Sequence, residues 1–191
     1  MKKQIMVMLL GILLLAVPAG AKEGFYAGAG FMNNTMLNSD LNTLKSAVGL
    51  DVRVGYNFGS FSLEGNIMGS GHDEKRAGYG KVSFTGLSID FRIPLTAPEK
   101  PNQVYVLAGL GGYSLKGFDP VAAADVKYTG GGYNLGAGLE HYFNEHLAFD
   151  LAAVYRAIKY DAKEVRGDTT KLSPRITGDT LSVEAGLNYH F

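Results

Sequence analysis

Strict two-residue alternation at the C-terminal end constrains this chain more than any other feature. From Leu181 to Phe191 every odd position is apolar or aromatic, and every even position is small or polar. Side chains of a β-strand alternate between its faces, so this segment has one apolar and one polar face. A soluble sheet would pack the apolar face on a core. A transmembrane barrel would turn it to lipid and the polar face to the lumen, and about this length crosses a bilayer when tilted.

The same alternation recurs along the rest of the chain and predicts eight strands joined as hairpins. No later apolar run is long enough for a transmembrane helix, so any membrane span must consist of strands. We therefore expect an all-β fold, a closed antiparallel eight-stranded transmembrane β-barrel. The eight segments are 24–32, 46–58, 61–67, 82–93, 104–115, 131–143, 147–156 and 181–191.

The inward and outward faces of two of these segments are not settled by alternation alone. Val82 and Phe84 fall on the wrong face for the strand that ends at Ile93, and a bulge around 85–86 would restore the register. The segment 104–115 is apolar on both faces. Its two tyrosines, at positions 105 and 113, favour the odd positions as outward-facing.

The connections alternate in length, as in outer-membrane barrels that have both termini in the periplasm. Long connections are expected at 33–45, 69–78, 116–128 and 160–177, and short ones between them, including a Gly59-Ser60 turn. The aromatic residues form two groups about a bilayer apart, as interfacial girdles do. The group at the short-turn end is Phe25, Tyr56, Phe58, Phe61, Phe91, Tyr105, Phe143, Phe149, Tyr189 and Phe191, and the group at the long-loop end is Phe31, Tyr113, Tyr133 and Tyr155.

The N-terminus has the pattern of a cleavable signal peptide over residues 1–21. Lys2 and Lys3 precede an apolar stretch from Ile5 to Val17, and a small-residue site ends at Ala21. The mature barrel domain is then expected at 22–191. Basic and acidic residues balance at 18 each in the whole chain, so there is no basic footprint for nucleic acid. The absence of cysteine excludes disulfides and thiol chemistry.

The chain resembles the small eight-stranded outer-membrane barrels, that is, the OmpA-type transmembrane domain and its OmpX-like relatives in the porin family. The resemblance rests on the segments 135–143, 147–155 and 186–191. It implies a location in the outer membrane of a Gram-negative-type bacterium, with outer-membrane lipid and lipopolysaccharide as surroundings. It also implies that Tyr189 and Phe191 belong to the C-terminal signal read by the barrel insertion machinery.

The alternation that places apolar residues outside also collects charges inside. Six acids and three arginines are predicted to face the lumen. An eight-stranded barrel is only wide enough for its side chains to fill it, so these charges must be paired, hydrogen-bonded or hydrated. We expect a salt-bridge network that fills the barrel. Its members are Asp51, Arg53, Glu64, Asp90, Arg92, Glu140, Asp150, Arg156 and Glu184.

Two local pairings follow from the turn lengths. The Gly59-Ser60 turn places Arg53 on the diagonal from Glu64, which predicts an ion pair. The connection at 144–146 places Glu140 opposite Asp150. Two facing carboxylates cannot both ionise cheaply, so either an arginine bridges them or one keeps its proton. Arg92 is the expected bridge.

The sequence gives little support for catalysis. We expect no cofactor and no catalytic residues. We also expect no metal site, because the histidines lack paired ligand spacing. One distant alternative, an outer-membrane lipid A acyl hydrolase, would need a serine beside a histidine base. Ser70 and His72 are the one such pair.

The function we expect is non-enzymatic. The barrel would serve as an envelope scaffold or an adhesion-type surface protein, whose four outer loops meet a surface ligand. Five cations near the last loop could meet lipopolysaccharide phosphates, although interleaved acids make simple solvation an alternative. A second hypothesis is a narrow, cation-favouring pore for ions or small solutes. The five cations are Lys159, Lys163, Arg166, Lys171 and Arg175.

Overall fold

The computed structural model describes residues 23–37, 43–75, 80–97, 100–120 and 123–191. The expected signal peptide, 1–21, lies outside these residues. Within them the chain forms nine strands of one antiparallel sheet. No helix in the described part of the chain is long and apolar enough to cross a membrane. The strands are β1 (Gly24–Met36), β2 (Ala47–Asn57), β3 (Ser62–Asp73), β4 (Lys81–Pro94), β5 (Asn102–Asp119), β6 (Ala124–Tyr142), β7 (Leu147–Val165), β8 (Asp168–Thr177) and β9 (Thr180–His190).

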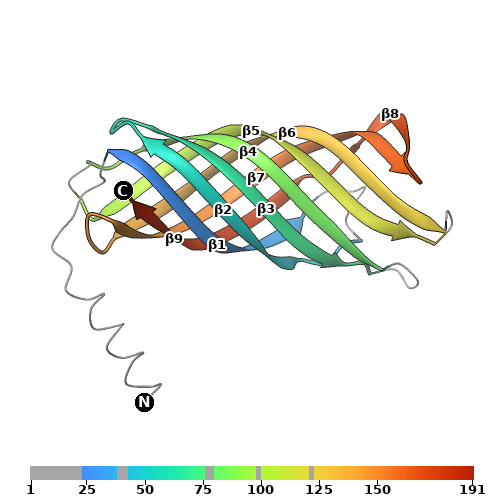
Figure 1. Cartoon of the computed structure of the whole chain (residues 1–191), viewed down its shortest axis with the longest axis horizontal. Helices are drawn as coiled ribbons and strands as arrows, with labels where there is room; N and C mark the ends of the chain where they lie inside the picture. Colours follow the sequence, from blue (N-terminus) through green and yellow to red (C-terminus); the bar gives the residue numbers. More distant parts are fainter. Residues whose placement is uncertain (1–22, 38–42, 76–79, 98–99, 121–122) are drawn as a thin grey trace, which may run out of the picture.

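The sheet closes on itself (Figure 1). Consecutive strands pair from β1 to β7, and β9 joins β7 to β1, while β8 pairs with β7 alone among the described strands. Setting β8 aside, eight of the nine strands make the barrel. The expected closed eight-stranded fold is therefore confirmed. Closure removes the unpaired edges that an open sheet would expose.

The two ends of the barrel differ. Short turns and the C-terminus gather at one end (Figure 1). There the Phe191 N–H donates to the Phe25 carbonyl at 3.0 Å. Gly59 closes one turn with φ at 85°, a conformation that favours glycine. We call this end the turn end, and the opposite one the hairpin end.

At the hairpin end, two segments expected to be loops are strands. β5 and β6 leave only a short connection of the predicted loop 116–128, and β7 and β8 occupy most of 160–177. Continued backbone pairing satisfies the peptide groups that a long loop would leave to water. Parts of the other two expected loops, 38–42 and 76–79, lie outside the described residues.

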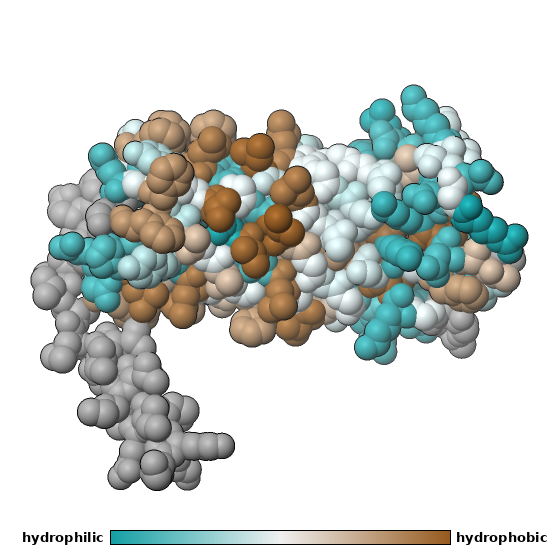
Figure 2. All heavy atoms as spheres, viewed as in Figure 1, coloured by the Kyte–Doolittle hydropathy of each residue, from teal (hydrophilic) through white to brown (hydrophobic). Residues whose placement is uncertain are grey.

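On the face shown in Figure 2, apolar side chains cover the barrel from the turn end to its middle, and polar side chains gather at the hairpin end. Each of the eight barrel strands carries exposed apolar residues, so these form a belt. Outward residues such as Val48 and Leu110 are 69% and 71% exposed. Such a belt would be unstable in water but is the lipid-facing surface of a membrane barrel. Aromatic rings with centroids 4.6–5.9 Å apart continue the belt at the turn end, in the order Phe25, Tyr56, Phe58, Phe61 and Phe91.

Two expectations about strand faces are wrong. β4 pairs with β3 and β5 in unbroken register, without a bulge at 85–86, and Phe84 is fully buried. In β5 the tyrosines at 105 and 113 are buried, whereas Val104 and Leu110 are exposed. Phe84 and Tyr113 face inward because the lumen at the hairpin end is itself apolar, so an apolar side chain there does not signal a lipid face. Tyr105 faces inward nearer the turn end, where its hydroxyl donates to Asp150.

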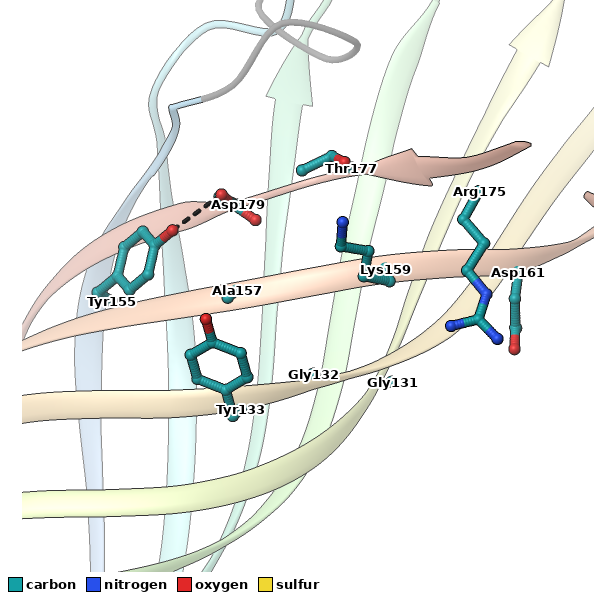
Figure 3. Close-up of a pocket in the computed structure, with 10 residues that line it drawn as sticks. All are labelled: Gly131, Gly132, Tyr133, Tyr155, Ala157, Lys159, Asp161, Arg175, Thr177 and Asp179. Atoms are coloured by element: carbon teal, nitrogen blue, oxygen red, sulfur yellow. Dashed lines mark hydrogen bonds between the residues drawn. The ribbon is translucent and has the colours of Figure 1, made fainter. Parts of the chain in front are cut away.

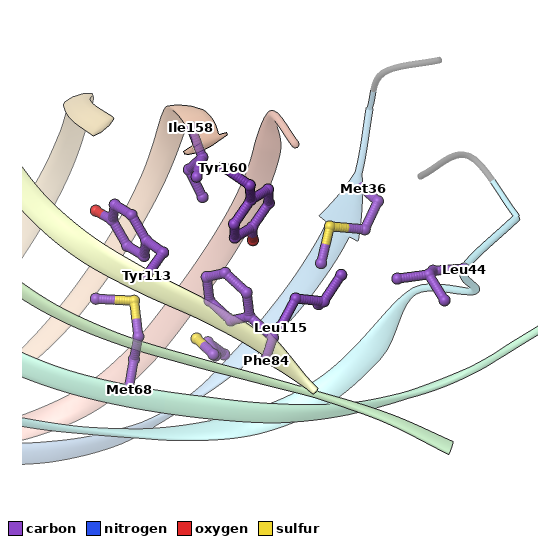
Figure 4. Close-up of a cluster of buried hydrophobic side chains, with 9 residues drawn as sticks. Met36, Leu44, Met68, Phe84, Tyr113, Leu115, Ile158 and Tyr160 are labelled. Carbon is purple, nitrogen blue, oxygen red and sulfur yellow. The ribbon is translucent and has the colours of Figure 1, made fainter. Parts of the chain in front are cut away.

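A group of inward-facing apolar side chains fills the lumen near the hairpin end (Figure 4). We call this group the outer cluster. Its side chains come from β1, β3, β4, β5 and β7 and from the segment before β2, and each is buried. Phe84 stacks on Tyr113 with ring centroids 5.8 Å apart. The members are Met32, Met36, Leu44, Met68, Phe84, Tyr113, Leu115, Ile158 and Tyr160.

Candidate functional site: the charged lumen

The remainder of the lumen, between the outer cluster and the turn end, is charged. All nine residues expected there point inward, and the most exposed of them, Glu140, is 8% accessible. Strand periodicity places them, because each lies on the face opposite the lipid-facing residues of its own strand. The ion pairs of Arg53 and Arg92 with Asp150 join strands that are not neighbours in the sheet.

Asp150 on β7 is the centre of the network. Its Oδ2 accepts from Arg53 Nη1 at 2.5 Å, and its Oδ1 accepts from Arg92 Nη2 at 2.7 Å and from the Tyr105 hydroxyl at 2.8 Å. Arg53 also binds Asp51 through Nε at 2.9 Å. Two guanidinium groups thus compensate a carboxylate that is fully buried.

Arg92 lies between the carboxylates at the turn end. The register sets Glu140 opposite Asp150. Arg92 Nη2 lies 2.7 Å from Asp150 and 3.9 Å from Glu140, and its Nη1 donates to Glu64 at 2.9 Å. The expected Arg53–Glu64 pair is replaced by this Arg92–Glu64 pair. Arg53 instead reaches across the lumen to β7, which the turn geometry of β2 and β3 could not reveal.

The remaining three charges form two smaller groups. Arg156 Nη2 binds Glu184 at 2.6 Å, and its Nη1 donates to Ser182 at 2.6 Å. Asp90 accepts from the Ser88 hydroxyl and the Asn134 amide, both at 2.7 Å. Asp90 is thus held by neutral donors.

Three tyrosines outside the predicted charge network supply further donors. Tyr26 donates to Glu64 at 2.9 Å and Tyr142 to Glu140 at 3.0 Å, alongside the Tyr105 bond to Asp150. They help to balance a network in which acids outnumber arginines. The alternation pattern places Tyr26 and Tyr142 on the inward face, so the sequence could have predicted their place in the network. It could not predict that of Tyr105, because β5 is apolar on both faces.

Inward tyrosines pack over inward glycines of the neighbouring strand. A Cβ at Gly138 would lie 2.3 Å from the Tyr105 ring carbon Cζ, and one at Gly55 would lie 2.4 Å from the same atom of Tyr26. Register places each glycine opposite its tyrosine. The missing side chains therefore make room for the rings.

Ser70 and His72 do meet, near the outer cluster. His72 Nδ1 donates to the Lys45 carbonyl at 2.8 Å, so Nε2 accepts from the Ser70 hydroxyl at 2.9 Å. His72 lies beyond Ile67, the last exposed apolar residue of β3, and burial lowers its pKa. Both residues are buried, and Phe84 packs edge-on against the imidazole. The pair has the hydrogen bond of a nucleophile and base, without an open substrate site among the described residues.

The described lumen offers little empty space. A cavity of about 30 Å³ opens at the turn end beside Arg92, Tyr105 and Glu140. The described residues contain no cluster of three or more histidines and carboxylates able to hold a metal. The side chains fill the barrel, as expected for eight strands.

The residues expected to form the C-terminal signal lie on the outside. Tyr189 is 49% and Phe191 is 65% exposed, and their rings meet edge to face at 5.2 Å. His146 stacks on Tyr189 at the turn end. Both aromatics are therefore part of the lipid-facing surface of the last strand.

A closed barrel with a lipid-facing belt and a filled, charged lumen defines a small integral outer-membrane barrel protein. The chain belongs to the family described as "Outer membrane protein beta-barrel domain", whose model matches residues 7–191. Among curated protein sequences, none matches this chain.

Solved structures of outer-membrane barrels share this fold. Neisserial surface protein A is 16% identical, with a TM-score of 0.64 over 88% of this chain and 97% of that one. OprG of Pseudomonas aeruginosa is 15% identical, with a TM-score of 0.61 over 92% and 99%. The attachment invasion locus protein Ail of Yersinia pestis, solved in complex with the heparin analogue sucrose octasulfate, is 16% identical, with a TM-score of 0.57 over 89% and 100%.

Proposed function

We propose that this protein is a non-enzymatic, non-conducting outer-membrane scaffold that presents its hairpin end to the cell exterior as an adhesion-type surface. The single observation that carries the proposal is the filled lumen. An ion-pair network occupies its middle and turn end, and the outer cluster occupies its hairpin end. Apolar constrictions also oppose ion passage, because they shed water.

Planar-bilayer recording tests the closed lumen. We expect the folded protein to show no stable open level. The narrow-pore alternative predicts a stable conductance that changes when Glu140 or Asp150, both in the lumen, is neutralised. Observing that conductance would overturn the scaffold proposal.

Orientation is part of the proposal. Both termini lie at the turn end in the mature protein we envisage, and short turns face the periplasm in this class of barrels. An epitope inserted at Gly167, in the turn between β7 and β8, should be accessible on intact cells. An epitope after Phe191 should become accessible only after permeabilisation. The opposite pattern would refute this orientation.

The hairpins also carry the surface chemistry for a ligand. The β5–β6 and β7–β8 hairpins and β4 line a polar groove of about 500 Å³. Its lining includes hydroxyls, three cations and two carboxylates: Lys116, Lys127, Arg166, Asp125 and Glu164. Since Ail was solved with a sulfated heparin analogue, sucrose octasulfate is a suitable first probe. We expect binding that falls when Lys127 and Arg166 are both changed to Gln. Equal binding by that variant would remove the groove from the proposal.

The same proposal assigns the exposed C-terminal aromatics, Tyr189 and Phe191, to recognition by the insertion machinery. Changing Phe191 to Ser should slow assembly in cells while leaving the stability of the purified, refolded barrel nearly unchanged. A loss of stability as large as the loss of assembly would indicate a structural role instead.

A further inference from the structure

A second groove lies on the outer wall of the barrel, above the apolar belt. It has a volume of about 490 Å³ and crosses β6, β7 and the end of β8 (Figure 3). Residues without long side chains, Gly131, Gly132 and Ala157, form its floor. We call it the wall groove.

The ends of the wall groove differ in chemistry. Tyr133 and Tyr155 stand on the membrane side, and Lys159 and Arg175 stand toward the hairpin end (Figure 3). Lys159 follows Tyr155 by four residues on the same strand face, which places its Cα about 13 Å further out. Tyrosines of this kind occupy the membrane–water interface. The two cations are thus at the level of lipid headgroups.

Both cations are available to a ligand. Among the described residues, neither Lys159 nor Arg175 forms an ion pair, and both are exposed. Asp179, a carboxylate of the same groove, is buried and accepts hydrogen bonds from the Tyr155 hydroxyl at 2.8 Å and the Ile158 amide at 3.3 Å. The remaining carboxylate of the groove is Asp161.

We propose that the wall groove binds the phosphorylated headgroup of a glycolipid of the outer leaflet, lipopolysaccharide. The phosphate lies between Lys159 and Arg175, where a guanidinium and an ammonium both favour phosphate oxygens. An acyl chain runs past Tyr133 and Tyr155 and continues along the apolar belt. The proposal rests on the proposed orientation, because only then does the groove face the outer leaflet.

Native mass spectrometry of the folded protein in detergent tests the site with bisphosphorylated lipid A as the probe. We expect K159Q/R175Q to bind it roughly tenfold more weakly than the unmodified protein, an ordinary loss for two phosphate contacts. Lipid A stripped of phosphate should bind both proteins equally weakly. Inorganic phosphate should not compete, because it lacks the acyl contacts.

The matched control is K45Q/K81Q, which removes two exposed lysines near the hairpin end that do not line the wall groove. It should bind lipid A like the unmodified protein. D161N should bind more tightly, because it removes a negative charge that lines the groove. An equal loss in both double variants would show unspecific charge attraction, and unchanged binding by K159Q/R175Q would overturn the site.

This experiment stands apart from the tests of the proposed function. Binding in detergent depends on neither membrane orientation nor conductance. A conducting or inverted barrel could therefore still bind lipid A in the wall groove, and a closed, correctly oriented barrel could fail to bind it.

Discussion

Replacement of Arg92 by Met tests whether the lumen network holds the barrel together. Arg92 is buried, with Glu64 at 2.9 Å, Asp150 at 2.7 Å and Glu140 at 3.9 Å. Its guanidinium also lies 3.9 Å from the centre of the Tyr105 ring. Methionine fills much of the volume but leaves three carboxylates without this cation. Removing one partner of a buried ion pair costs about 3–5 kcal/mol, and we expect a loss of unfolding free energy in that range.

The matched control removes an exposed cation. Lys116 pairs with Asp125 at 3.0 Å, with side chains 57% and 62% accessible, so K116M should cost less than about 1 kcal/mol. Unfolding by urea from lipid vesicles can be followed by circular dichroism and gel mobility, because the chain lacks tryptophan.

A double variant separates charge from packing in the Arg92 experiment. R92M/E64Q should recover part of the stability lost in R92M, since it removes one uncompensated charge. The reasoning is refuted if R92M costs no more than K116M. It is also refuted if the E64Q change destabilises R92M as much as it destabilises the unmodified protein.

Three further outcomes are expected from the same assay. G138V should lower the free energy of unfolding by about 1–3 kcal/mol, because it displaces the Tyr105 ring. G65V, at an open outward position, should be nearly neutral. Equal effects would contradict the packing argument. F84A should cost about 3–5 kcal/mol, because the outer cluster cannot close over the cavity, and a smaller loss would indicate a loosely packed cluster. Because the pKa of His72 is lowered in the folded protein, the unfolded chain binds this proton more readily as pH falls below about 6.5. The free energy of unfolding should therefore fall with pH in this range. H72Q should flatten this pH dependence, and parallel pH curves for the two proteins would disprove the argument.

The sequence by itself determined the barrel and the inward charges, because both depend on a property local to each strand. Alternation at Val48 to Val54 or Leu181 to Tyr189 separates the two faces without knowledge of any neighbour. Turn lengths fixed adjacent registers in the same way, such as Glu140 opposite Asp150. These inferences needed only one strand, or two strands and the turn between them.

Only the tertiary structure decided what the faces meet. Arg53 from β2 and Arg92 from β4 converge on Asp150 from β7, a choice made across the lumen by the closure and stagger of the whole sheet. The inward positions of Phe84 and Tyr105 depend in the same way on the surroundings. An apolar side chain is removed from water equally well by an apolar lumen and by lipid. Hydrophobicity alone therefore could not predict its face, which depends on the closure of the whole sheet.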